Sequence, residues 1–147
     1  MLIGMLILAY AGIDTIKMLL KINSWIKWVK IKDYNTLQQL REAGKTVKNQ
    51  IDEITKTNPE IQYLLIIEGQ ASKDNYSQNY ELSYERALAL SRFWQSSGID
   101  FGKNCEVLIS GSGTGGSMRD SYEKNNQRFL IHIIPKTGKI EQKNNEN

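Results

Sequence analysis

The sequence predicts an α/β (α+β) two-layer sandwich, in which two main helices cover one face of a small mixed sheet. Three observations lead to this fold class. Two long segments carry apolar residues at helical spacing, shorter apolar runs have the length of strands, and the two kinds of segment alternate along the chain. With 147 residues, 40% of them apolar, the chain suits one domain and a short extension.

The first helix is predicted over residues 35–57. Asn35 can cap its start, and apolar residues recur along it at helical spacing: Leu37, Leu40, Val47, Ile51 and Ile54. The helix should end before Asn58, because Pro59 disfavours helical geometry in the residue that precedes it. The run at residues 61–67 is continuously apolar and rich in isoleucine, so we expect a central strand that is buried on both faces.

The second helix is predicted over residues 80–97. Four residues of this segment lie on one helical face: Ser83, Ala87, Leu90 and Trp94. Gly98 follows where a glycine commonly ends a helix. Two further strands are expected at residues 107–110 and 129–134, with a candidate short helix between them at residues 118–126.

The N-terminal residues 1–32 form an apolar and basic segment. Residues 2–13 are apolar, but a membrane-spanning helix needs about 20 mainly apolar residues. Extending the run to residue 22 takes in three charged residues: Asp14, Lys17 and Lys21. Three interpretations stay open: a short or imperfect membrane anchor, a cytosolic apolar helix, or a start displaced from the natural one. Residues 28–31 are a candidate first strand.

The expected domain organisation is therefore a candidate anchor at residues 1–32, a folded domain at residues 33–136 and a disordered tail at residues 137–147. The tail is rich in Lys, Asn and Glu. Basic residues are spread along the chain, whose net charge is +3, so nucleic acid is not an expected partner. One cysteine and one histidine, Cys105 and His132, exclude a disulfide within the chain and a Cys/His zinc site. No nucleophile with a matching base is visible, so we expect no catalytic residue, no cofactor and no metal.

Several short motifs occur in an order that resembles a known family. Residues 79–90 read N-Y-E-L-S-Y-E-R-A-L-A-L, and residues 98–100 read G-I-D. These segments match the N-x-x-L-S-x-x-R-A-x-x-V helix and the following G-I-D of the OmpA-like C-terminal domain. That domain is shared by outer-membrane anchors, the peptidoglycan-associated lipoprotein and the flagellar stator B subunit. Residues 68–69, 111–113 and 126–129 add weaker matches to its E-G-H-T-D, G-x-G and N-R-R-V motifs.

The resemblance covers roughly residues 34–135 and implies a β-α-β-α-β sandwich without enzymatic activity. Members of the family typically bind the diaminopimelate of the peptidoglycan stem peptide. A loop aspartate takes the ligand ammonium, and the helix arginine, here Arg86, takes the carboxylate. An arginine suits a carboxylate because its planar fork binds both oxygens. The implied location is the bacterial cell envelope, either periplasmic or membrane-anchored, including the outer membrane.

The chain departs from the family pattern at the acidic half of this pair. Ser72 occupies the place of the aspartate, and Gln127 replaces the first arginine of N-R-R. Asp74 lies two residues beyond Ser72 and would substitute only if the loop follows another path. Loss of the carboxylate removes a charge-assisted hydrogen bond worth about 1.5–3 kcal/mol. The expected ligand site comprises five residues, with weakened or altered binding: Arg86, Ser72, Asp74, Asn79 and Arg128.

Alternative functions stay open at this point. Arg86 would be structural if its fork braced the neighbouring loop, and the domain would then be an interaction module that has lost peptidoglycan binding. Arg128 is more often a bracing residue than a ligand contact, and His132 is expected to lie on a strand face without chemistry. A stator-like subunit of an ion-driven membrane complex is a third hypothesis, with Asp14 as the ion-carrying carboxylate. The sequence does not determine the oligomeric state.

Overall fold

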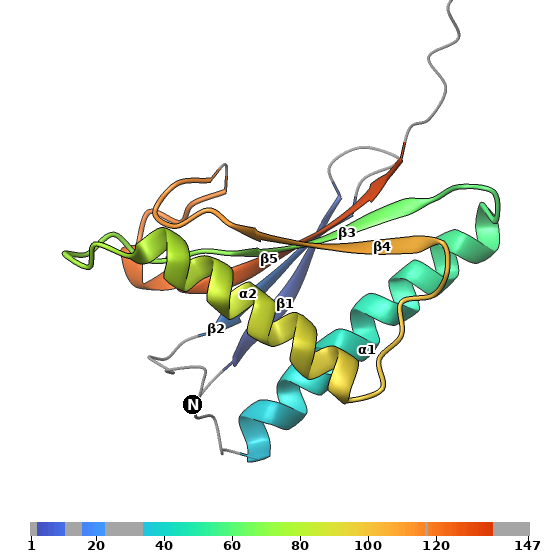
Figure 1. Cartoon of the computed structure of the whole chain (residues 1–147), viewed down its shortest axis with the longest axis horizontal. Coiled ribbons are helices and arrows are strands. Elements are labelled where there is room, and N and C mark those ends of the chain that lie inside the picture. Colours follow the sequence, from blue (N-terminus) through green and yellow to red (C-terminus); the bar gives the residue numbers. More distant parts are fainter. Residues whose placement is uncertain (1–2, 11–15, 23–33, 117, 137–147) are drawn as a thin grey trace, which may run out of the picture.

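The computed structural model describes residues 3–10, 16–22, 34–116 and 118–136. Along the chain it contains strands β1 (Ile3–Tyr10) and β2 (Ile16–Ile22), helix α1 (Tyr34–Thr57), strand β3 (Tyr63–Gly69), helix α2 (Asn79–Ser96), strand β4 (Cys105–Gly111), the short 3-10 helix η2 (Glu123–Asn126) and strand β5 (Arg128–Pro135). Both long helices lie on the same face of the sheet (Figure 1). The predicted two-layer α/β architecture is therefore confirmed.

The strands form one mixed sheet in the order β1-β2-β5-β3-β4. β3 and β4 are parallel, whereas β5 runs antiparallel to both of its neighbours, β2 and β3. Ile67 illustrates the register, because it lies opposite Ile109 of β4 and Ile131 of β5. The carboxyl ends of the two parallel strands therefore meet at one edge of the domain, together with the start of α2.

The core lies between the helices and the sheet. Its fully buried members come from both layers: Leu40, Val47 and Ile51 of α1, Ala87, Leu90 and Trp94 of α2, and Leu65, Ile67, Ile131 and Ile133 of the strands. The Trp94 indole Nε1 donates a 2.7 Å hydrogen bond to the carbonyl oxygen of Leu40. The bond gives the buried indole N–H the partner that it needs. It also links α2 to α1.

Strand β3 is buried on one face only, which corrects the expectation of burial on both faces. Burial alternates along it, with Leu65 and Ile67 facing the helices and Ile66 half-buried on the other face. Glu68 lies on that second face, and its Oε2 is 2.9 Å from Nε2 of His132. The single histidine is thus partnered by a carboxylate across two strands.

Ile3–Tyr10 and Ile16–Ile22 are strands, so the two helical interpretations are wrong for these residues. β1 and β2 pair antiparallel, and β2 adds to β5 from Ile16 opposite Ile133 to Lys21 opposite Arg128. The sheet therefore includes strands that precede the expected domain boundary at residue 33. A short apolar run has no periodicity that separates strand from helix, and pairing with β5 decides between them here.

None of the helices in the described ranges is long and apolar enough to cross a membrane. Three sequence predictions lie outside the described residues. These are the role of Asp14, the candidate strand at residues 28–31 and the disordered tail from residue 137.

Candidate functional site

Two glycines allow the start of α2 to lie directly on the ends of the parallel strands. A Cβ atom at Gly69 would be 1.9 Å from the carbonyl oxygen of Ser83, and one at Gly111 would be 2.6 Å from the backbone nitrogen of Tyr84. The Ser83 hydroxyl accepts a 2.9 Å hydrogen bond from the backbone N–H of Gly113. The E-G, L-S and G-x-G motifs are thus parts of one contact, which fixes the start of the helix against the ends of β3 and β4.

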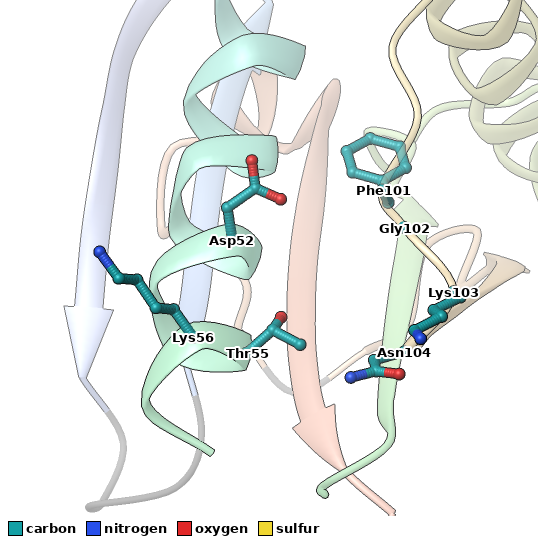
Figure 2. Close-up of a pocket in the computed structure, with 7 residues that line it drawn as sticks. All are labelled: Asp52, Thr55, Lys56, Phe101, Gly102, Lys103 and Asn104. Atoms are coloured by element: carbon teal, nitrogen blue, oxygen red, sulfur yellow. The ribbon is translucent and has the colours of Figure 1, made fainter. Parts of the chain in front are cut away.

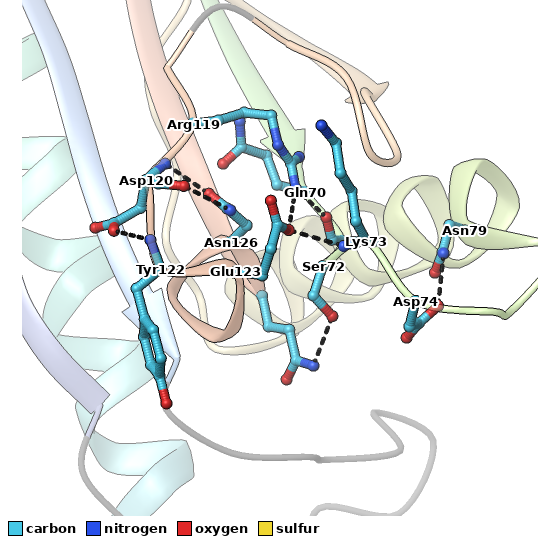
Figure 3. Close-up of polar contacts among 12 residues, drawn as sticks. Gln70, Ser72, Lys73, Asp74, Asn79, Arg119, Asp120, Tyr122, Glu123 and Asn126 are labelled. Carbon is cyan, nitrogen blue, oxygen red and sulfur yellow. Dashed lines mark hydrogen bonds and ion pairs between the residues drawn. The ribbon is translucent and has the colours of Figure 1, made fainter.

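Asp74 and Asn79 form a bonded pair in this loop. Oδ1 of Asp74 accepts a 2.8 Å hydrogen bond from Nδ2 of Asn79 (Figure 3). It also accepts a 2.9 Å hydrogen bond from the backbone N–H of Tyr76. These two bonds, with a smaller contribution from the charge of Arg86, hold the pKa of Asp74 below its ordinary value. No described residue donates a hydrogen bond to Oδ2, so one oxygen of an oriented, exposed carboxylate is available to a ligand.

Arg86 lies beside this pair without a bond to hold it. Its side chain is largely buried, and the buried Nε–H has no hydrogen-bond partner among the described residues. Burial lowers the pKa of Arg86, and the nearby charge of Asp74 acts in the opposite direction. A guanidinium stays protonated in proteins, so the site contains a charged donor that is not satisfied within the described part of the chain.

The Ser72 hydroxyl is engaged in an internal hydrogen bond. Ser72 is buried, and its hydroxyl accepts a 3.0 Å hydrogen bond from Nε2 of Gln127. The two positions at which the chain departs from the family pattern therefore contact each other. Both members of this pair are neutral, so the contact leaves no unpaired charge at either position.

Arg128 is a bracing residue in this structure. Its Nε donates a 2.8 Å hydrogen bond to Oε1 of Gln70, and Nη2 donates to the carbonyl oxygen of Met118. Both Arg128 and Gln70 are buried, and burial lowers the pKa of Arg128. Of the five predicted site residues, the structure therefore brings together Asp74, Asn79 and Arg86, and commits Ser72 and Arg128 to internal bonds.

Sequence reasoning missed Arg119, which braces the loop. Its Nη2 donates to the carbonyl oxygen of Ala71 at 3.1 Å and to Oε2 of Glu123 at 2.8 Å. The same Glu123 oxygen accepts a 2.8 Å hydrogen bond from the backbone N–H of Lys73, the main cause of its lowered pKa (Figure 3). The spacing of Arg119 and Glu123, four residues apart, is the only sequence signal, and it is common in solvated segments.

We predict that Arg119→Ala destabilises the domain by about 1.5–3 kcal/mol, because it breaks charge-assisted bonds to Ala71 and Glu123. Urea denaturation measures this loss, and amide exchange at Lys73 should accelerate. Lys124→Ala is the control, because Lys124 is the exposed neighbour of Glu123. Equal stability of both variants would show that the loop is held by other contacts.

A separate hollow of about 300 Å³ lies at the opposite end of β3 and β4, between the end of α1 and the segment before β4 (Figure 2). Asp52, Thr55 and Phe101 are among its lining residues. Asp52 is already paired with Lys48 at 2.9 Å, and Lys56 points away from Phe101. The hollow therefore does not gather a set of free charged groups comparable to Arg86 and Asp74.

Comparison with known proteins places this fold in a class. A scan against protein-family models found no match, and neither did a search of curated proteins. Solved structures do match. An outer membrane protein from Borrelia burgdorferi B31 is 16% identical, with a TM-score of 0.53 over 88% of this chain and 96% of that chain. A periplasmic domain of MotB gives a TM-score of 0.60 at 14% identity, over 88% of this chain and 67% of that chain.

The periplasmic domain of MotB from Helicobacter pylori gives a TM-score of 0.55 at 14% identity, over 88% of this chain and 87% of that chain. Similarity at this level establishes the fold and leaves function to the site. The fold is that of OmpA-like domains, as the sequence motifs predict.

Proposed function

We propose that this protein is a non-enzymatic cell-envelope module that binds the zwitterionic amino-acid end of a peptidoglycan stem peptide. Arg86 would take the ligand carboxylate, and Asp74 would take the ammonium. The observation that carries the proposal is the buried Nε–H of Arg86, which has no hydrogen-bond partner among the described residues, near the fixed carboxylate of Asp74. A zwitterionic end needs one cation and one anion at short distance, and these two side chains supply them.

Asp74 supports this proposal better than Ser72 does. The Ser72 hydroxyl already accepts a hydrogen bond from Gln127, and a neutral hydroxyl does not balance an ammonium. Asp74 carries a charge, influences the pKa of Arg86 and keeps Oδ2 unbonded within the described residues. In this proposal the acid of the site is Asp74, two residues beyond Ser72, and the site is zwitterionic instead of purely positive.

The bracing interpretation of Arg86 has less support, because the loop is already braced by Arg119 and Glu123. The buried Nε–H of Arg86 has no partner among the described residues, and a bound carboxylate would supply one. The envelope location is proposed from the fold shared with a Borrelia outer membrane protein and a MotB periplasmic domain. The stator-like alternative depends on Asp14, which lies outside the described residues.

We predict that Asp74→Asn weakens binding of a diaminopimelate-containing stem peptide about ten- to a hundredfold, because one charge-assisted hydrogen bond to the ammonium is lost. Titration calorimetry on the full chain measures the change. Asp100→Asn is the matched control, since Asp100 Oδ1 accepts a bond from Gly102 N–H much as Asp74 does from Tyr76. Because the pKa of Asp74 is held below its ordinary value, the Asp74-dependent affinity should persist to a lower pH than an ordinary aspartate would allow.

Ser72→Asp distinguishes the two positions for the acid. If Asp74 is the partner of the ammonium, a second carboxylate at residue 72 changes affinity less than Asp74→Asn does. A large gain in affinity from Ser72→Asp, with no loss from Asp74→Asn, would mean that the ammonium binds at position 72, where the family pattern has its aspartate. No binding by the wild type or by any variant would make the domain an interaction module.

A further inference from the structure

We propose that the edge of β4 and the adjoining flank of α2 form an interface between two copies of this chain. β4 has a neighbour, β3, on one side only within the sheet that the structure describes. Edge strands of monomeric proteins are usually protected by lysine, proline, a bulge or shortness. β4 has seven residues, C-E-V-L-I-S-G, without proline or lysine, and pairs with β3 without a register shift.

This edge exposes large apolar side chains to solvent. Val107 is 36% exposed on the helix side of the sheet, and Leu108 is 40% exposed on the other side. Glu106 is the strand's single charge, and it is paired with Lys136. The strand thus combines an outer edge that pairs with no other strand of the described sheet and two exposed, large apolar side chains, which favours pairing with another strand.

The flank of α2 above β4 is likewise uncharged. Its residues recur at helical spacing: Tyr80, Tyr84, Leu88, Ser91 and Gln95. Tyr80 and Tyr84 are 58% and 46% exposed, and both approach the glycines that end β4. The charged residues of this helix lie elsewhere, as Arg86 does on the opposite flank. Two uncharged surfaces therefore adjoin along one side of the molecule.

The second copy fits this surface because β4 is complementary to itself. In an antiparallel pair centred on Leu108, all seven residues pair, and Leu108 lies opposite Leu108 of the other copy. Glu106 then lies opposite Ser110, so the charge does not meet its own copy. A shift that centres the pair on Glu106 would oppose two carboxylates, which disfavours that register.

The helices also come to a suitable distance. α2 packs on both β3 and β4, so its axis lies about one strand spacing, roughly 5 Å, from the proposed two-fold axis. The two copies of α2 would then be about 10 Å apart on the same face of a continuous sheet, and helices pack at about 8–10 Å. Tyr84 and Leu88 would fill the space between them. The ligand site at Arg86 stays free, because it lies on the other flank.

Leu108→Lys in the full chain tests the interface by sedimentation equilibrium. We expect a dimer in the wild type and an apparent dissociation constant about a hundredfold higher in the variant, because two lysines meet at the two-fold axis. Tyr122→Lys is the matched control, since Tyr122 is 58% exposed and lies outside α2 and β4. It should leave the dimer unchanged.

Mixing the Leu108→Lys and Leu108→Glu variants tests the register. If residue 108 lies opposite residue 108 of the other copy, lysine and glutamate attract each other and a heterodimer forms. In addition, Leu108→Cys in a Cys105→Ser background should form a disulfide between copies on oxidation, whereas Tyr122→Cys in that background should not. A wild type that remains monomeric at high concentration overturns the proposal. So does a dimer that Leu108→Lys leaves intact, or one in which the mixed charges fail to associate.

Discussion

Arg86→Ala should abolish binding of the diaminopimelate-containing stem peptide without lowering the stability of the domain. The loss should be about a hundredfold or more, because the guanidinium would supply two charge-assisted hydrogen bonds to the ligand carboxylate. Stability should stay the same or rise, because Arg86 makes no hydrogen bond within the described residues and its burial disfavours the charge. Titration calorimetry and urea denaturation on the same samples measure both effects.

The matched control is Arg92→Ala, since Arg92 is an exposed arginine of the same helix. Arg86→Lys refines the result. It retains the positive charge and loses the planar fork, so an intermediate affinity would indicate that the ligand carboxylate is bound through both oxygens. A clear loss of stability in Arg86→Ala, together with a wild type that does not bind, would instead make Arg86 a structural residue.

Gly69→Ala should destabilise the domain by about 3 kcal/mol, among the largest effects of any single methyl group in this fold. The added Cβ would lie 1.9 Å from the carbonyl oxygen of Ser83, and this contact is with backbone, which no side-chain rotation relieves. The start of α2 would have to move away from β3. Because Asn79 and Arg86 belong to that part of the helix, ligand affinity should fall as well.

Gly98→Ala separates this steric effect from the intrinsic difference between glycine and alanine. Gly98 has a φ of +76°, and nothing lies within 4 Å of an added Cβ, so the change should cost only about 1 kcal/mol through backbone strain. Urea denaturation of both variants provides the comparison. Equal losses would mean that the strand and helix separate easily at Gly69.

The helices were the most predictable part of the fold. The expected ranges 35–57 and 80–97 agree closely with Tyr34–Thr57 and Asn79–Ser96, because periodicity and end signals are local properties. The strand expected at residues 61–67 is observed at Tyr63–Gly69, since an apolar run does not reveal which residues pair. The N-terminal hairpin could not be predicted, because its partner β5 lies at the far end of the sequence.

The candidate site was predictable where a motif carried it. Arg86 and Asn79 followed from the helix motif, whereas the role of Asp74 depends on the loop path, which the sequence left open. The hydrogen bonds from Asn79 and Tyr76 define that path. Arg119 belongs to no motif, and its contact with Ala71 arises only when the segment that holds Arg119 and Glu123 meets the loop after β3.

The central position of β5 has a consequence for the order of folding. The hairpin of β1 and β2 and the pair of β3 and β4 are joined to each other in the sheet only through β5. Among the described strands, β5 comes last in the sequence, so a nascent chain that ends before Arg128 has two separate half-sheets. Pairing across such sequence distances slows folding, so we expect the continuous sheet to form only after β5 has been synthesised. A protein that must pass through a membrane channel as an extended chain would benefit from that delay.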